Sequence, residues 1–465
     1  MLAPAHRNSL RIGIHPAVSL ADDVSALMPR ARDDLARLVA IPSVADERQF
    51  PRENCLEAAR LVAQLFADAG MGEVRELASP DGYPAVFGSA HGPAGAPTVL
   101  LYCHYDVQPP LGEDAWHTPP FALTTGDDGR WYGRGAADDK GGLVTHLTAL
   151  RALGGASFPL NLKLIVEGSE EQGSAGLDAV VAEHQDLLAA DVIAVADGGN
   201  FAVGEPTLTT TLRGIANVVI TVRSLRSAVH SGIFGGAAPD ALVALVRMLA
   251  TLHDDAGTTR IRGLPNDMSW EGEGYPPERY RVDATMLDGV DLVGDGSVAD
   301  MLWSRYSVNV LGIDCPPVVG ATASVQPRAR ATVSLRVPPG QDEGAALEAL
   351  TAHLEAVAPW HVEVTLELGR GAAPFRARTD GPAFSAMRRA LGAAYGTPAR
   401  TAGQGGSIPL CTLLQAAMPQ AEILLYGVEE PRCLIHAPNE SVDPGEIERM
   451  ALAEALFLRE SAGSV

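Results

Sequence analysis

The chain has 465 residues and a hydrophobic content of 46%, enough for a sizeable core in two domains or one elaborated domain. Its formal net charge of −22 argues against binding to nucleic acid or anionic membranes, whose phosphates would repel it. We find no apolar stretch near the roughly 20 residues of a spanning helix, and Pro16 and Asp22 interrupt any signal peptide. The five scattered cysteines form no C-x-x-C pair, which favours a reduced, cytoplasmic compartment.

Strands and helices alternate in the first half of the chain. Short apolar runs predict buried strands at 98–103, 161–166 and 192–196, and helical spacing of apolar residues predicts helices at 140–153 and 175–184. This β-α-β alternation predicts an α/β fold with a largely parallel sheet. Sites in such sheets form at the carboxyl ends of the strands.

The pattern changes after Thr211. We expect strands at 216–222, 331–337 and 361–366 and helices at 241–252 and 343–357, whereas 260–317 is irregular and acidic. The first pattern returns from about Ala373, with a helix at 381–395, a strand at 422–425 and a helix at 444–461. The middle part is therefore predicted to be a smaller α+β domain, 212–372, inserted into a catalytic domain made of 1–211 and 373–465.

A histidine and a carboxylate, His104 and Asp106, follow the first predicted strand. If the strand continues through Asp106, both side chains leave the same face of the sheet. A metal-bound imidazole usually donates its other N–H to a carboxylate or carbonyl, a part that Asp106 could play. A polar pair capped by solvent is the alternative, because H-x-D alone is a weak motif.

A glycine-rich segment, 133–142, carries Asp138 and Asp139 at the start of a predicted helix. Its glycines allow the backbone to approach a compact ligand, and the positive end of the helix stabilises the carboxylates. One carboxylate can bind two cations, using one oxygen for each. A turn with an N-cap aspartate is the alternative, but a double aspartate is more than a cap requires.

Adjacent glutamates, Glu170 and Glu171, follow the second predicted strand. Because adjacent side chains diverge, one can bind a metal while the other takes a proton from water at the open coordination position. Two exposed acids are the alternative for an isolated pair. Asp197 ends the third strand and His436 lies in a Pro- and Asn-containing loop; neither is specific alone. Together the clusters predict two divalent metal ions and a metal-dependent hydrolase.

The chain resembles the M20 family of metallopeptidases, from about residue 30 onward. The motifs that carry the resemblance are H-Y-D-V-Q-P at 104–109, G-R-G-A-A-D-D-K-G at 133–141, E-G-S-E-E-Q-G-S at 167–174, A-D-G at 196–198 and the His436 loop. The resemblance implies an α/β fold: a phosphorylase/hydrolase-like mixed-sheet catalytic domain with an inserted, smaller α+β lid and dimerisation domain.

The resemblance also implies the roles of the site residues. The five metal ligands are His104 and Asp197 for one ion, Glu171 and His436 for the other, and Asp138 between the two. Glu170 would be the general base and Asp106 would support His104; the Asp138–Asp139 peptide is cis in such enzymes. The metal is expected to be zinc, and manganese or cobalt would suit the same ligands.

Three further segments resemble the substrate-binding positions of the family. His230 corresponds to a histidine that reaches the active site of the partner subunit in a homodimer and stabilises the developing oxyanion. Arg336 corresponds to an arginine that binds a substrate carboxylate, and Gly406 and Ser407 belong to a loop that binds the same group through backbone N–H groups. Arg213 is interpreted as structural.

The amino-acid sequences of the motifs and the length of the insertion most resemble those of the dipeptidase branch. We therefore expect hydrolysis of dipeptides or short peptides. An N-acyl amino acid deacylase or a carbamoyl amidohydrolase on the same scaffold is the alternative. A non-catalytic peptide-binding member is a rival from another class, but it predicts a lost ligand or base, and all are present here. The expected partners are a small substrate and a second copy of the chain.

Overall fold

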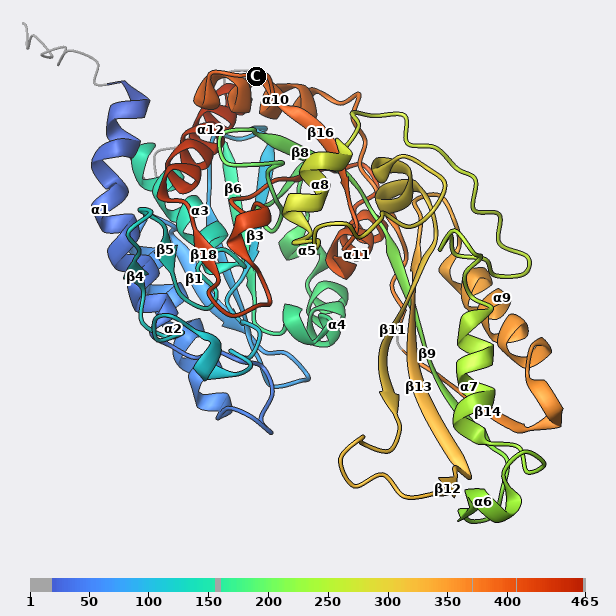
Figure 1. Ribbon diagram of the computed structural model, residues 1–465. Coiled ribbons are helices and arrows are strands. Elements are labelled where there is room, and N and C mark those ends of the chain that lie inside the picture. Colours follow the sequence, from blue (N-terminus) through green and yellow to red (C-terminus); the bar gives the residue numbers. More distant parts are fainter. Residues whose placement is uncertain (1–18, 155–159, 370, 407, 463–465) are drawn as a thin grey trace, which may run out of the picture.

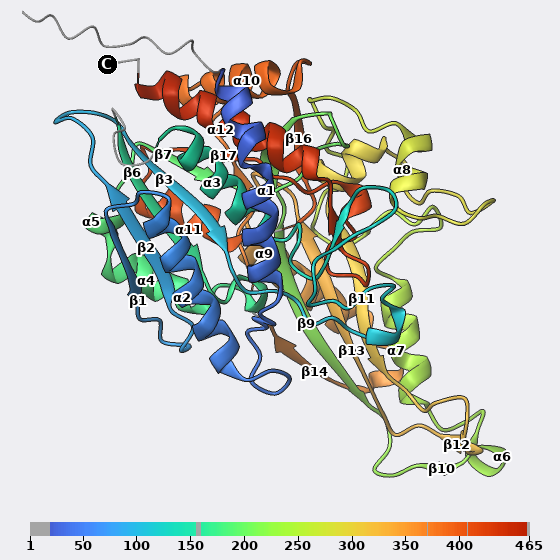
Figure 2. The same cartoon turned by 90° about the vertical axis from the view of Figure 1, so that its left-hand side faces the viewer.

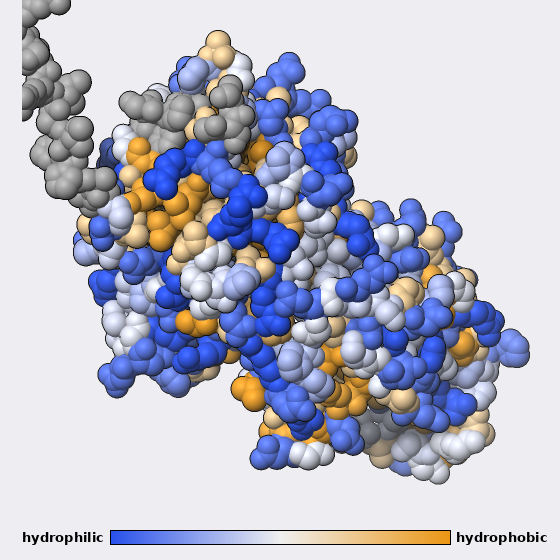
Figure 3. All heavy atoms as spheres, turned by 90° about the horizontal axis from the view of Figure 1, so that it is seen from above, coloured by the Kyte–Doolittle hydropathy of each residue, from blue (hydrophilic) through white to orange (hydrophobic). Residues whose placement is uncertain are grey.

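The computed structural model describes residues 19–154, 160–369, 371–406 and 408–462, which form two bodies, each built around its own sheet (Figure 1). The larger body contains the helices at both ends of the described chain. Seen from above, hydrophilic residues are spread over both bodies, with apolar residues in patches between them (Figure 3). None of the described helices is long and apolar enough to cross a membrane.

The larger body contains a nine-stranded sheet in the order β1-β2-β6-β3-β7-β17-β8-β15, with β16 pairing with β8. Its strands are β1 (Glu73–Leu77), β2 (Ala85–Ala90), β3 (Thr98–His104), β6 (Asn161–Glu167), β7 (Val192–Val195), β8 (Thr207–Leu212), β15 (Phe375–Arg376), β16 (Arg400–Gln404) and β17 (Glu422–Leu425). The central strands β6, β3, β7 and β17 are parallel to one another, whereas β1, β2, β8 and β15 take part in antiparallel pairs. The sheet is therefore mixed, as the resemblance implies, and the prediction of a largely parallel sheet holds only for its centre.

Apolar residues on both faces of the sheet explain its position between two layers of helices. In β3, Val99 and Leu101 enter one hydrophobic core, and Leu100 and Tyr102 enter the other, because successive side chains of a strand point to opposite faces. The first core is shared with α1 (Leu20–Val39), α2 (Arg52–Asp68), α3 (Lys140–Ala152), α10 (Pro382–Tyr395) and α12 (Pro444–Ala462). The second core is shared with α4 (Ala175–Glu183), α5 (Gln185–Leu188) and α11 (Pro409–Ala417).

The smaller body contains a four-stranded antiparallel sheet in the order β11-β13-β9-β14. Its strands are β9 (Gly214–Arg223), β11 (Ser307–Asp314), β13 (Arg328–Val337) and β14 (Glu363–Leu368), and its core includes α7 (Ala241–Ala250) and α9 (Glu343–Ala356). The end of this body farthest from the larger sheet carries β10 (Val229–His230), β12 (Ser324–Val325) and α6 (Ser231–Phe234) (Figures 1 and 2).

The prediction of an irregular segment at 260–317 is wrong in part. The segment contains α8 (Pro277–Asp283), the π-helical turn η3 (Asp300–Ser304) and strand β11. Strand β11 was not predicted because it lies at the edge of the sheet. From Asn309 onward its residues are exposed, so its sequence lacks the alternation of apolar and polar residues that identifies a half-buried strand.

Short elements complete the fold around the larger sheet. They are the three-stranded sheet of β4 (Thr124–Thr125), β5 (Trp131–Tyr132) and β18 (Ser441–Val442), and the 3₁₀ turns η1 (Glu113–Ala115), η2 (Glu170–Gln172), η4 (Pro359–His361) and η5 (Pro431–Cys433). The pairing of β5 with β18 joins the two distant parts of the chain that carry the glycine-rich segment and the His436 loop.

Candidate metal centre

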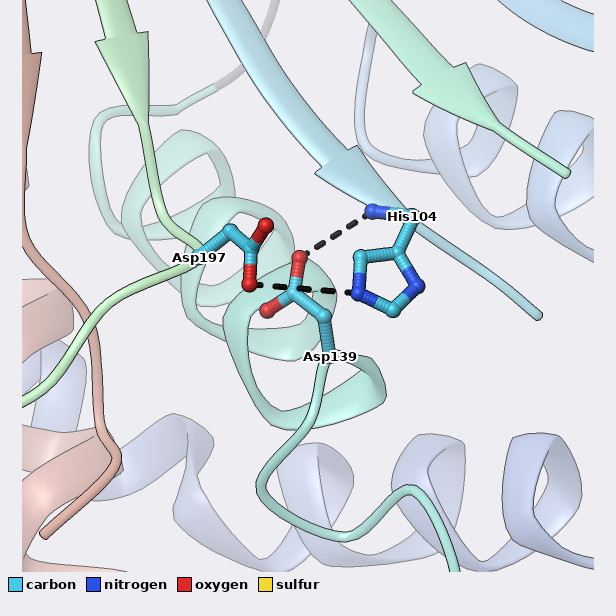
Figure 4. Close-up of side chains that lie close together, drawn as sticks. All are labelled: His104, Asp139 and Asp197. Atoms are coloured by element: carbon cyan, nitrogen blue, oxygen red, sulfur yellow. Dashed lines mark hydrogen bonds and ion pairs between the residues drawn. The ribbon is translucent and has the colours of Figure 1, made fainter. Parts of the chain in front are cut away.

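His104 ends strand β3, and its side chain is fully buried. Its ring Nδ1 lies 3.1 Å from the carbonyl oxygen and 3.3 Å from the carboxylate Oδ1 of Asp106. Its backbone N–H donates to Asp139 Oδ2 over 3.0 Å, and its Nε2 lies 3.8 Å from Asp197 Oδ1 (Figure 4). The imidazole is thus fixed in orientation, with Nε2 directed at the carboxylates.

Asp106 also connects His104 to the two adjacent glutamates. Its Oδ1 and Oδ2 accept hydrogen bonds from the backbone N–H groups of Glu170 and Glu171, at 3.1 and 3.0 Å. Strand β3 does not continue through Asp106, so the shared-face condition of the sequence interpretation is not met. The contact between Asp106 and His104 arises from the loop after the strand instead.

Asp138 lies between the two histidines, with one carboxylate oxygen towards each. Its Oδ1 lies 3.0 Å from His104 Nε2, and its Oδ2 lies 2.9 Å from His436 Nε2. His436 Nε2 is also 3.3 Å from Glu171 Oε2. The Asp138–Asp139 peptide is cis, as the resemblance implies. Side chains from four separate stretches of sequence, those of His104, Asp138, Glu171 and His436, therefore lie close together.

The segment that carries Asp138 is anchored by Glu440, a buried residue of the His436 loop. The carboxylate of Glu440 accepts hydrogen bonds from the backbone N–H groups of Gly135, Ala137 and Asp138, and Arg134 Nη1 donates to it over 2.7 Å. The loop that supplies His436 therefore also sets the position of Asp138.

Two polar residues next to the proposed ligands, Lys140 and Cys103, are buried. Lys140 Nζ donates to the carbonyl oxygens of Leu38 and Ile41, both over 2.9 Å, which is a structural role. Cys103 lies inside β3, and burial raises the pKa of its thiol well above the usual value. Cys103 belongs to none of the possible groups of metal ligands in the described part of the chain.

The acidic groups of the centre are held in an environment that favours bound positive charge. Burial, with Asp197 close by, raises the pKa of Glu170 well above its usual range, and burial raises the pKa of Asp197 to about 7. Hydrogen bonds from His104 and His436 outweigh burial at Asp138 and lower its pKa. Contacts with Asp138 and Glu171 raise the pKa of His436 to about 11. Several buried carboxylates with few cationic partners fit divalent cations as neutralising ligands.

Three groups of ligand atoms in the described residues are compact enough to hold a metal ion, each with its atoms within 4.8 Å of one another. They are His104, Asp139 and Asp197; Asp138, Glu171 and His436; and Asp138, Asp197 and Glu429. The sequence interpretation placed Asp139 beside Asp138 at the start of the helix but gave it no place in the ligand set, and it missed Glu429 altogether. The position of Glu429 soon after β17, beside the end of β7, is the signal that could have identified it.

The described residues that are predicted to bind substrate lie on other elements than the proposed ligands. His230 is exposed on β10, at the far end of the smaller body (Figures 1 and 2). Arg336 lies on β13, where it pairs with Ser307 of β11, and burial together with Arg336 lowers the pKa of Arg213 to about 10. Arg213 also donates to Ser307 Oγ over 2.8 Å between the two bodies. Gly406 follows β16, and Ser407 lies outside the described residues.

Comparison with known proteins agrees with this arrangement. Residues 100–460 match the model of peptidase family M20/M25/M40. The chain belongs to the M20 family. It is a metal-dependent peptidase of this family. It is 44% identical to a cysteinylglycine-S-conjugate dipeptidase of Corynebacterium striatum, over 86% of this chain and 89% of the relative. It is 28% identical to the Beta-Ala-His dipeptidase of Homo sapiens, over 95% of this chain and 88% of the relative.

Solved structures of the family share the fold of this M20 peptidase. The dipeptidase Dug1p from Saccharomyces cerevisiae superposes with a TM-score of 0.83 at 23% identity, covering 96% of this chain and 98% of its own. Human carnosine dipeptidase 1 superposes with a TM-score of 0.82 at 25% identity, covering 96% and 99%. The prediction of an M20-type metallopeptidase fold is confirmed.

Proposed function

We propose that this M20 peptidase hydrolyses dipeptides with two divalent metal ions per chain, zinc being the expected ion. The proposed ligands are His104 and Asp197 for one ion, Glu171 and His436 for the other, and Asp138 for both. The observation that carries the proposal is the position of Asp138, whose two oxygens lie 3.0 and 2.9 Å from the two histidines. A carboxylate between two imidazoles in this way is suited to bind a different cation with each oxygen.

The donor set fits divalent metal ions, since it combines two imidazoles with buried carboxylates. Such ions, when bound, polarise a carbonyl and lower the pKa of a water molecule. We assign the proton transfers to Glu170: it takes the proton of the attacking water and later gives it to the leaving amine. Burial raises the pKa of its carboxyl group, which favours holding the proton between the two transfers.

Asp106 is proposed to act through its neighbours. It holds the imidazole of His104 at Nδ1 and the backbone of Glu170 and Glu171 through two N–H groups. One carboxylate therefore orients a ligand from each half of the centre and the base itself. We count Asp106 as a positioning residue for this reason.

The relatives support dipeptides as substrates, since their names specify cysteinylglycine S-conjugates and Beta-Ala-His. Arg336, Gly406 and Ser407 are proposed to bind the carboxylate end of the substrate, as the resemblance implies. The alternative substrates are N-acyl or N-carbamoyl amino acids, which present the same carboxylate end but lack a free amino group next to the scissile bond.

We further propose a homodimer in which segment 212–372 is the dimerisation domain and His230 acts in the partner's site. Two observations support it. His230 is exposed on β10, at the end of the smaller body farthest from the larger sheet (Figure 2). The edge strand β11 exposes Val310, Leu311 and Ile313 and leaves one backbone edge unpaired, which suits association with a second copy. A cytoplasmic location is proposed from the five free cysteines.

Amine release from a panel of substrates tests the reaction. The panel contains dipeptides, tripeptides and N-acyl amino acids, and the protein is stripped of metal and reloaded with zinc or manganese. We expect turnover of dipeptides that appears only on reloading, at a stoichiometry of two ions per chain. Turnover confined to N-acyl amino acids would move the enzyme to the deacylase alternative. Inactivity in protein holding two ions would favour the binding-protein rival.

Mixing two inactive variants tests the role of His230. Glu170→Gln removes the base and His230→Ala removes the group proposed to come from the partner, so each homodimer is expected to be inactive. Subunit exchange would create heterodimers with one intact composite site, and activity should reappear after mixing. Activity that fails to return, in samples where light scattering and mass labelling confirm mixed dimers, would place His230 in the site of its own chain.

A further inference from the structure

Glu429 is a buried carboxylate that the proposed reaction does not use. Its residue is 7% exposed, and its backbone is fixed next to the metal centre, where its carbonyl oxygen accepts from Asn200 N–H over 2.7 Å and it forms a bridge with Gly199. Its carboxylate comes within 4.8 Å of ligand atoms of Asp138 and Asp197. Within the described residues, this carboxylate has neither a hydrogen bond nor an ion pair, and a buried charge of this kind calls for a cationic partner.

The same residue lines a cavity of about 290 Å³ between the two bodies. Among the described residues, none of the five proposed metal ligands lines this cavity. Glu429 is therefore the group that connects the metal centre to the cavity. A substrate whose scissile carbonyl lies at the metal centre would have its adjoining atoms next to Glu429.

The walls of the cavity are aromatic and apolar. Phe201 packs against Tyr275 with ring centroids 4.7 Å apart, and Tyr275 stacks on Trp303 at 6.0 Å. Leu434 and Ile435, from the loop of His436, line the cavity as well. Walls of this kind accept an apolar side chain, with a few polar groups setting its orientation.

Two hydrogen-bond acceptors that line the cavity have no partner among the described residues. One is the carboxylate of Glu429, and the other is the buried amide Oε1 of Gln404. An ammonium group, which has three donors and no acceptor, is suited to such acceptors.

We propose that Glu429 binds the free α-ammonium group of the dipeptide, and that the aromatic cavity accommodates the amino-terminal side chain. This inference rests on the proposed dipeptidase function. It explains how the site would select a dipeptide over an N-acyl amino acid, since only the dipeptide carries a positive charge beside the scissile carbonyl. A salt link of this type binds and orients the substrate, and it takes no part in bond breaking.

Three substrates that differ only in the amino group test the proposal. Ala-Gly has an α-amino group, propionylglycine has none, and β-alanylglycine carries the amine one carbon farther from the carbonyl. The protein is the metal-loaded full chain, and kcat/KM is measured for wild type, Glu429→Gln, Glu429→Asp and the control Glu205→Gln. Glu205 is a suitable control because its carboxylate already pairs with Arg279 and Arg400 near the outer side of Phe201.

We expect Glu429→Gln to lower kcat/KM for Ala-Gly by about 10- to 100-fold, the value of one charge-assisted hydrogen bond, chiefly through KM. The value for propionylglycine should change less than about 3-fold, because no ammonium is lost from the contact. Glu429→Asp withdraws the carboxylate by one methylene, so it should shift preference from Ala-Gly towards β-alanylglycine. Glu205→Gln should leave all ratios unchanged.

Metal content separates this proposal from its rivals. Equal losses on Ala-Gly and propionylglycine with fewer than two ions per chain would make Glu429 a metal ligand, and equal losses with both ions retained would make it structural; either result overturns the inference. Unchanged kinetics would do the same. A wild-type enzyme with no preference for Ala-Gly over propionylglycine would contradict the dipeptide function itself, a result visible before any variant is made.

Discussion

The two histidines of the metal centre are held in opposite ways. His104 is fully buried at the end of a central strand, with its ring Nδ1, its Nε2 and its backbone N–H all in contact with carboxylates. The side chain of His436 is 53% exposed, in a loop where Leu434, His436 and Asn439 all have positive φ angles. Among the described residues, its contacts with the other proposed ligands are made through Nε2.

This difference divides the proposed metal centre into two halves. The buried half, with His104 and Asp197, is preorganised, and the exposed half, with Glu171 and His436, is adjustable. The buried half is set mainly by the ends of β3 and β7 and by packing. The exposed half depends on the anchoring of one loop, through Glu440 and through Asn439, whose side chain bonds to the backbone of His117 and Ala115. Asp138 is the only one of the five proposed ligands that contacts both histidines.

Loss of the carboxylate that both halves share should weaken both of them and give the largest loss of activity. Asp138→Asn removes the charge that both halves use, and we expect kcat/KM to fall by more than about 1,000-fold, about 4 kcal/mol of transition-state stabilisation. Elemental analysis should find both ions weakly held. Two tightly bound ions in this variant would show that the halves are independent of Asp138.

Loss of the base should leave both halves intact. Glu170→Gln keeps the shape of the side chain but cannot accept a proton, and we expect kcat to fall by about 100- to 1,000-fold. Metal content should stay at two ions per chain, in contrast to Asp138→Asn. Retained activity would transfer the proton-accepting role to another group.

Truncation of each histidine should reduce the free energy of unfolding by a different amount in the two halves. His104→Ala leaves a cavity and orphaned partners, at a cost of about 2–4 kcal/mol in the free energy of unfolding of the metal-free protein. His436→Ala should cost only about 1 kcal/mol, because water replaces a half-exposed ring and screens its charges. Urea unfolding measures both. Equal costs would contradict the distinction between a preorganised and an adjustable half.

Asp106→Asn should weaken the buried half without removing a ligand. The amide still fills the space but cannot hold the imidazole of His104 and accept two N–H groups with equal strength. We expect metal affinity or activity to fall by about 10- to 100-fold. Competition with a chelator measures the affinity; a loss confined to the ion at His436 would contradict the assignment of Asp106 to His104.

The smallest effect is expected at the loop anchor. Asn439→Ala removes two hydrogen bonds from the His436 loop and should weaken the exposed half by about 1 kcal/mol, or up to about tenfold in metal affinity. Asn439→Gly is the matched control, since it loses the same bonds but tolerates the φ angle of +66°. Equal effects in both variants would assign the loss to the bonds, and a larger effect in alanine would assign part of it to the backbone.

The sequence predicted the buried half of the centre better than the exposed half. Apolar runs identify β3, β6 and β7, so the residues at their ends, such as His104 and Asp197, can be expected at one edge of the sheet. His436 follows no strand and lies in a loop with positive φ angles, which no periodicity reveals. Its assignment needed the family resemblance.

Glu429 and strand β11 escaped prediction for related physical reasons. Glu429 is one of two adjacent glutamates before Pro431, a pattern typical of a solvated turn, and only the tertiary structure buries it beside Asp197. Strand β11 lies at a sheet edge and exposes most of its side chains. Burial that depends on distant parts of the chain leaves little trace in the local pattern, and for Glu429 the one signal was its position soon after a predicted strand.

The position of β17 between β7 and β8 has a consequence for the order in which the protein is made. Strand β17 and the loop after it come from the last part of the described chain, yet they complete the centre of the sheet and supply His436 and Glu440. A growing polypeptide on the ribosome would carry His104, Asp138 and Glu171 long before these residues emerge. A working peptidase would therefore not form before the segment that carries β17 and His436 has been made.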